Sequence, residues 1–195
     1  MNRNALILII SLGGLVLTTG CETPEPPKVE SVTTSTSQPI EAKALQRAQI
    51  NTMYERYRQE AFADVQDVHV DELMALDLKQ PILFVDCRED YEKAISMIEG
   101  AVSKADFEAD SDRYREYFVV AYCTIGYRSG IYAKTLQEQG FQTRNLIGGV
   151  LAWAHHGQPF VDADGNSTRR VHVYGEEWDL LPPTYESVYE GKSSP

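Results

Sequence analysis

Short apolar runs alternate with amphipathic stretches in the middle of the chain. Residues 82–85 and 118–122 are almost entirely apolar, as expected for parallel strands in a sheet that is covered on both faces. The segments with strand-like composition are residues 68–70, 82–85, 101–102, 118–122 and 144–147. The segments with helix-like composition are residues 71–78, 89–95, 130–139 and 150–155. This alternation predicts an α/β domain over residues 67–161, with a mainly parallel central sheet and helices on both faces.

The N-terminal segment has a different pattern. Arg3 precedes an apolar run over residues 5–17, which is shorter than the about 20 residues of a membrane-spanning helix. Its length and flanks predict a secretory signal peptide over residues 1–20. Gly20 and Cys21 resemble the cleavage box of a bacterial lipoprotein, so Cys21 would carry the lipid and hold the protein at the outside of a membrane. The alternatives are an ordinary signal peptide or a retained anchor helix.

The segments that flank the predicted domain carry distinct signals. Residues 21–40 are rich in Pro, Ser and Thr and predict a disordered tether to the lipid. Residues 41–66 contain many helix formers and predict a helix that lies on the domain, with a partner-binding helix as the alternative. Residues 162–195 begin with an acidic turn and continue with aromatic side chains. We expect this extension to pack onto the domain; an exposed docking surface for a protein partner is the alternative.

Cys123 stands between a predicted strand and a predicted helix. A strand, a tight loop and a helix together cradle anions, because successive backbone N–H groups point inward and the helix N-terminus is partially positive. A thiolate in such a cradle is stabilised, and the thiolate is the nucleophilic form of cysteine. Cys123 is therefore the candidate catalytic residue. The alternative is a buried, inert thiol at the end of a core strand.

The loop after Cys123 supplies the candidate binding groups. We expect Gly126 to adopt a positive φ, Arg128 to provide a cation for a bound anion or for the loop carbonyls, and Ser129 to cap the following helix. The residues whose backbone N–H groups would stabilise negative charge are Thr124, Ile125, Gly126, Tyr127, Arg128 and Ser129.

The motifs around Cys123 resemble those of the rhodanese-like sulfurtransferase domains. The family's active loop reads C-x-x-G-x-R-S, and residues 123–129 read C-T-I-G-Y-R-S. Residues 82–88 resemble the family's apolar strand ending in D-x-R, and residues 98–102 resemble its I-P-G-A segment. Residues 146–153 resemble its L-x-G-G-x-x-x-W signature. The resemblance covers residues 67–161 and implies a rhodanese-like fold for the α/β domain.

The resemblance also implies a double-displacement reaction. The Cys123 thiolate would take the outer sulfur of a small anion such as thiosulfate and form a persulfide, and a thiol or another thiophile would then accept that sulfur. Asp86 and Arg88 occupy the D-x-R positions, where they would brace the site; the alternative for them is an exposed ion pair of little consequence. The implied chemistry needs no cofactor and no metal.

Two other functions stay open. A related phosphatase loop has the form C-x5-R, whereas here four residues separate Cys123 from Arg128, a spacing that suits sulfur better than phosphate. The domain could also carry sulfur or bind a protein partner without turnover. Met97 and Glu99 depart from the His and Pro that the family often has at these positions, which bears on substrate preference more than on the nucleophile.

Cys87 raises the question of redox control. It follows Asp86 on a strand that would lie beside the strand of Cys123, and an oxidising compartment would permit a disulfide between them. The alternative is a buried cysteine that faces away from the nucleophile.

Charge and histidine content exclude other classes. The net charge of −11 disfavours nucleic-acid binding, which requires a basic patch, and leaves membrane contact to the lipid anchor. The histidines lack the spacing of a chelating pair, and His155 and His156 are adjacent. The sequence therefore predicts no metal site.

Overall fold

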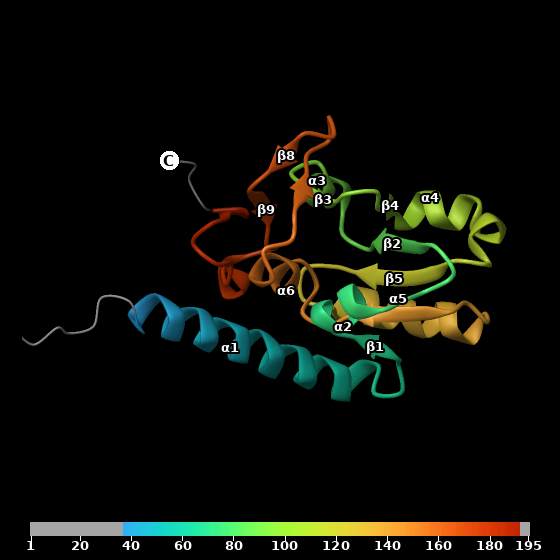
Figure 1. Cartoon of the computed structure of the whole chain (residues 1–195), viewed down its shortest axis with the longest axis horizontal. Helices are drawn as coiled ribbons and strands as arrows, with labels where there is room; N and C mark the ends of the chain where they lie inside the picture. Colours follow the sequence, from blue (N-terminus) through green and yellow to red (C-terminus); the bar gives the residue numbers. More distant parts are fainter. Residues whose placement is uncertain (1–36, 192–195) are drawn as a thin grey trace, which may run out of the picture. The chain divides into compact units, whose positions relative to one another are not determined.

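The computed structural model describes residues 37–191, with side chains from residue 40 onward. Its centre is a parallel sheet of strand order β1-β6-β5-β2-β4 (Figure 1). In that order the strands are β1 (Asp67–Val68), β6 (Thr143–Leu146), β5 (Phe118–Tyr122), β2 (Ile82–Asp86) and β4 (Val102–Ser103). The predicted α/β fold with a mainly parallel sheet is confirmed.

Helices cover this sheet (Figure 1). They are α1 (Ser37–Ala61), α2 (Val70–Ala75), α3 (Asp90–Lys93), α4 (Lys104–Ala109), α5 (Tyr127–Glu138) and α6 (Gly149–His155), with short 3-10 helices at Ser111–Tyr114 and Glu176–Trp178. The predicted helices after each strand are present with shifted ends. The shift that matters for the site is in α5, which begins three residues before the predicted start at Gly130 because its cap lies in the loop.

The sheet separates two cores, because neighbouring residues of a strand point to opposite faces. In β5, Val119 and Ala121 pack into the core that contains α4 and α5 residues such as Phe107 and Leu136. Val120 and Tyr122 pack into the other core, with residues of α2 and α6. Each residue of β5 is buried, so the loop that begins at Cys123 starts from a strand that is fixed on both sides.

Helix α1 packs against this domain, as the sequence predicted for a flanking helix. Ile50 and Met53 join the core that contains α6, and Tyr54 and Phe62 join the core that contains α5. The helix begins at Ser37, so the last four residues assigned to the tether are helical. No helix within residues 37–191 has the length and apolar character that a membrane span needs. The predicted signal peptide, Cys21 and the rest of the tether lie outside the described residues.

The C-terminal segment also packs on the domain, in agreement with the main prediction for it. β9 (Arg170–His172) pairs in parallel with β10 (Glu186–Val188), and Val171, Val173 and Leu180 are buried in the core that contains α6. A small antiparallel sheet joins β3 (Met97–Ile98), β7 (Phe160–Val161) and β8 (Ser167–Thr168). The acidic residues 162–166 form the turn between β7 and β8.

We predict that Gly149→Ala destabilises the protein far more than Gly157→Ala. Both glycines have positive φ, 49° and 70°, so alanine pays the left-handed penalty of about 1 kcal/mol at either site. A Cβ at Gly149 would overlap the carbonyl oxygen of Cys123 and lie 2.8 Å from that of Thr124, whereas a Cβ at Gly157 meets nothing within 4 Å. We expect a loss of more than about 3 kcal/mol for Gly149→Ala and about 1 kcal/mol for Gly157→Ala in urea unfolding. Equal losses of unfolding free energy in the two variants would contradict the close approach of α6 to the loop.

Candidate active site

The loop between β5 and α5 contains Cys123 at the carboxyl end of its strand. Gly126 is the N-cap of α5 and has a φ of 102°, which confirms the predicted positive φ. A Cβ there would lie 2.6 Å from the Tyr54 ring, so a side chain would also be excluded by space. The prediction that Ser129 caps the helix is wrong. Because α5 starts at Tyr127, Ser129 lies buried in its first turn, and its hydroxyl donates to Asn145 Oδ1 at 2.7 Å.

The sulfur of Cys123 receives a backbone hydrogen bond. Gly126 N–H donates to Cys123 Sγ at 3.2 Å. The first helical bond of α5 runs from Gly130 N to Gly126 O at 3.0 Å, so the N–H groups of Tyr127, Arg128 and Ser129 precede the helical ladder. They belong to the partially positive end of a twelve-residue helix. The arrangement favours negative charge on the sulfur.

Helix α6 holds the loop carbonyls from the other side. Val150 N–H donates to Cys123 O at 2.9 Å, and Leu151 N–H donates to Thr124 O at 3.3 Å. These two bonds tie the carbonyl oxygens of the loop to the N-terminus of α6. The approach depends on the absence of a side chain at Gly149, and this explains physically why a Gly-Gly pair stands at the start of α6.

Arg128 is paired with a glutamate that sequence reasoning did not single out. Its Nη1 donates to Glu92 Oε2 at 2.6 Å and its Nη2 to Glu92 Oε1 at 2.9 Å. Glu92 lies in α3 and is fully buried, whereas the Arg128 side chain is 27% exposed. Burial raises the pKa of Glu92, but the hydrogen bonds and charge of Arg128 outweigh it and lower that pKa below its ordinary value. The sequence signal was weak: one acid among several in a predicted helix.

The Arg128–Glu92 pair changes the expected role of the arginine. Its charge is partly offset by Glu92, and it interacts with two side chains of the loop, Thr124 and Cys123, instead of loop carbonyls. Its Nη2 donates to Thr124 Oγ1 at 3.3 Å, and Thr124 Oγ1 donates to Glu92 Oε1 at 3.3 Å. The three side chains therefore fix the side of the loop next to Cys123, and His172 Nδ1 lies 3.7 Å from Glu92 behind them.

Asp86 and Arg88 form a buried ion pair, not the exposed pair that was the alternative. Arg88 Nη2 donates to Asp86 Oδ2 at 2.6 Å, and both side chains have no exposed surface. Arg88 Nη2 also donates to Ser96 O at 2.6 Å. Next to this pair, Cys87 N–H donates to Tyr122 O at 2.9 Å. This backbone bond ties the end of β2 to the end of β5, whereas the ion pair itself holds the carbonyl of Ser96, and its role as a brace for Cys123 stays a prediction.

Cys87 and Cys123 are both free thiols in this structure. Cys87 Sγ lies 3.8 Å from Val85 O, its hydrogen-bond acceptor. Burial, together with the negative charge of a Cys123 thiolate, raises the pKa of Cys87 well above its ordinary value. Cys87 therefore stays protonated at neutral pH, and the effect of the Cys123 charge places it near Cys123, so its role as a redox partner stays a prediction.

Asn145 is a second residue that the sequence reasoning missed. It is buried on β6, and its Nδ2 donates to Gly126 O and to Tyr54 Oη, both at 3.0 Å. Its Oδ1 accepts the Ser129 hydroxyl. One amide thus fixes both the cap and the first turn of α5. The sequence offers little signal for it, because residues 143–144 in the same short strand are polar as well.

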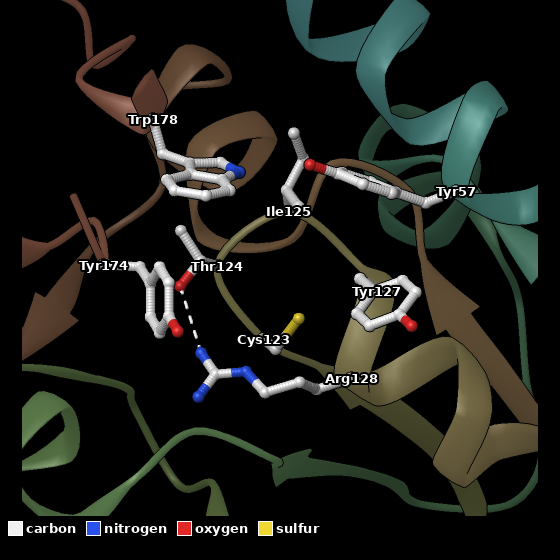
Figure 2. A pocket seen from close by; sticks show the side chains of 8 residues that line it. All are labelled: Tyr57, Cys123, Thr124, Ile125, Tyr127, Arg128, Tyr174 and Trp178. Carbon is white, nitrogen blue, oxygen red and sulfur yellow. Dashed lines mark hydrogen bonds between the residues drawn. The ribbon is translucent and has the colours of Figure 1, made fainter. Parts of the chain in front are cut away.

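A cavity of about 300 Å³ opens onto Cys123. Figure 2 shows the sulfur between the Arg128 and Tyr127 side chains, with further aromatic rings around it. The lining residues are Tyr57, Cys123, Thr124, Ile125, Tyr127, Arg128, Tyr174 and Trp178. Cys123 itself is 1% exposed, so access to the sulfur runs through this cavity. The sequence analysis did not assign Tyr57, Tyr174 or Trp178 to a site.

We predict that Glu92→Gln lowers the free energy of unfolding at pH 7 by about 2–3 kcal/mol, less than for a fully buried pair because Arg128 is partly exposed. The folded-state pKa of Glu92 is lowered relative to an unfolded value of about 4.3. The wild-type advantage is therefore complete above that pH and is lost as the pH falls through the folded pKa. Urea unfolding between pH 3 and 8 measures it, with the half-exposed Glu108→Gln as control. If the difference in unfolding free energy between wild type and Glu92→Gln does not shrink in acid, the result would contradict the ion pair.

The residues of this site from Asp86 to Asn145 lie within a region that resembles known proteins. Residues 69–156 match the family model described as a rhodanese-like domain. The chain is 34% identical over 96 residues to a sulfurtransferase of Allochromatium vinosum, an alignment that covers 44% of this chain and 84% of the relative. It is 35% identical over 89 residues to the putative sulfurtransferase YtwF of Bacillus subtilis, covering 43% and 84%.

Solved structures are similar as well. The thiosulfate sulfurtransferase of Pseudomonas aeruginosa is 21% identical with a TM-score of 0.46, and the match covers 60% of this chain and 23% of that one. A rhodanese-like domain protein of Staphylococcus aureus is 28% identical with a TM-score of 0.40, covering 48% and 96%. From the two sulfurtransferase relatives and the matched family model it follows that this chain belongs to the rhodanese-like sulfurtransferase family.

Proposed function

We propose that the protein is a sulfurtransferase that moves a sulfane sulfur from a small anionic donor, such as thiosulfate, to a thiol or another thiophile through a persulfide on Cys123. The observation that carries this proposal is the hydrogen bond from Gly126 N–H to Cys123 Sγ, at the N-terminus of α5 and at the floor of a cavity. Nucleophilic attack on an anion requires a hydrogen-bond donor beside the attacking sulfur and a partially positive helix N-terminus nearby.

In the proposed reaction the Cys123 thiolate attacks the outer sulfur of the donor. The sulfur–sulfur bond of thiosulfate breaks, its electron pair leaves with sulfite, and a new sulfur–sulfur bond forms on Cys123. An acceptor thiolate then attacks the outer sulfur of the persulfide and releases the Cys123 thiolate, so that charge balances in each half. Gly126 N–H stabilises the negative sulfur before and after the transfer. Arg128 and Thr124 keep the loop in place beside it.

We predict that thiosulfate adds the mass of one sulfur atom to the soluble domain (residues 37–195) and that Cys123→Ser abolishes the addition. A subsequent thiol or cyanide should remove the extra mass with repeated turnover, because the persulfide is an intermediate. Intact-mass analysis and a thiocyanate assay measure the two halves. A protein that gains the sulfur but does not release it would be a carrier, and a protein that never gains it would contradict the proposed function.

We also propose that the protein is a lipoprotein of the cell envelope, anchored through Cys21. The support is the sequence of residues 1–21, with its apolar run and the Gly20-Cys21 box. We predict that the protein incorporates labelled fatty acid, that Cys21→Ser abolishes the incorporation and that Cys87→Ser keeps it. Absence of label from the wild-type protein, or equal labelling of Cys21→Ser, would contradict the lipid anchor.

A further inference from the structure

Three of the eight residues that line the Cys123 cavity lie outside the family domain, and all three are aromatic. Tyr57 belongs to α1, and Tyr174 and Trp178 belong to the C-terminal segment, whereas the family match ends at residue 156. Figure 2 shows Tyr57 and Tyr127 on one side of the sulfur, and Tyr174 and Trp178 on the other. The segments before and after the family domain thus supply aromatic rings to the cavity around Cys123.

These rings are held in pairs. The Tyr57 and Tyr127 centroids are 5.2 Å apart, and the Tyr174 and Trp178 rings meet edge-on, also at 5.2 Å. Arg128 Cζ lies 5.4 Å from the centre of the Tyr174 ring, so the guanidinium links the second pair to the loop. The volume of about 300 Å³ lies at the lower end of the range for small organic ligands, about 300–1,000 Å³. Thiosulfate has no apolar surface to place against such walls.

Tyr174 carries an independent sign of a ligand contact. Its φ is 71°, and among the described residues it is the only one other than glycine with a positive φ. Gly175 N–H donates to Val173 O at 2.9 Å, which with this φ forms the rare, strained γ-turn. Burial does not compensate the strain, because Tyr174 remains 53% exposed. The turn directs an aromatic ring at the cavity at a cost in stability, as strained residues at ligand clamps do.

We propose that the physiological donor is an organic sulfane-sulfur anion with a flat apolar group, and that the pairs Tyr57–Tyr127 and Tyr174–Trp178 bind this group. The proposal rests on the sulfurtransferase function proposed above and adds the substrate class. A thiosulfonate has this chemistry. The Cys123 thiolate attacks its outer sulfur, the sulfur–sulfur bond breaks, and its electron pair leaves with the sulfinate, while the persulfide forms. Cyanide then takes the sulfur as thiocyanate and restores the thiolate.

The test compares donors that share the reacting group. Benzenethiosulfonate and methanethiosulfonate differ only in the apolar substituent, and each rate is divided by that donor's uncatalysed rate with cyanide. We expect the soluble domain to favour benzenethiosulfonate by at least about tenfold in kcat/KM, since filling an apolar pocket discriminates to this extent. In Tyr174→Ala and in Trp178→Ala the ratio should fall by about fivefold or more. Unfolding midpoints confirm that the variants are folded.

Tyr91→Ala is the matched control. Tyr91 is 54% exposed, like Tyr174, but its ring contacts His172 and does not line the cavity. We expect it to keep the wild-type donor ratio. Tyr174→Gly, which relieves the backbone strain while it removes the ring, should lose selectivity without losing stability. A wild-type ratio near one, or an equal ratio in wild type and Tyr174→Ala, would overturn the substrate class. Absence of thiocyanate from every donor would instead overturn the sulfurtransferase function itself.

Discussion

The hydrogen bond from the Gly126 N–H to the Cys123 sulfur depends on how the rest of the structure positions these two groups. β5 is buried on both faces and fixes the start of the loop, and α5 begins at the first residue after the glycine cap. Helix α6 ties the two loop carbonyls that would otherwise be free to turn. The restraints from α5 and α6 are backbone to backbone and require glycines that allow close approach. Side chains add to them, because Asn145 holds Gly126 O and Arg128 holds Thr124.

Side-chain electrostatics around the sulfur are arranged in neutral pairs. Arg128 pairs with Glu92, and Arg88 pairs with Asp86, in both cases with partners that have little or no exposed surface. Burying such pairs is costly unless their geometry is good, and both have bidentate contacts. A negative Cys123 sulfur is stabilised by the Gly126 N–H and by the charge of Arg128, while Glu92 and Thr124 hold that arginine in place. A chain with a net charge of −11 can still stabilise a negative sulfur at Cys123, because the groups that contact this sulfur act locally.

The sequence predicted the sheet, the place of Cys123 at the end of a strand and the positive φ of Gly126, because these follow from apolar runs and from a loop motif. It misplaced the helix cap at Ser129, since a glycine can cap a helix without a side-chain signal. Glu92, Asn145 and the aromatic walls were missed for another reason. They reach Cys123 from distant parts of the chain, and no local pattern shows which polar or aromatic residue of a flanking segment folds over the site.

The most direct measurement is the amide resonance of Gly126 in ¹⁵N-labelled protein, before and after thiosulfate treatment. If this N–H points at the sulfur, its signal should shift when Cys123 carries a persulfide, and the signal of Gly140 at the far end of α5 should stay where it is. In Cys123→Ser the treatment should change neither signal. An unmoved Gly126 resonance in protein that mass analysis shows to be persulfidated would contradict the cradle on which the chemistry depends.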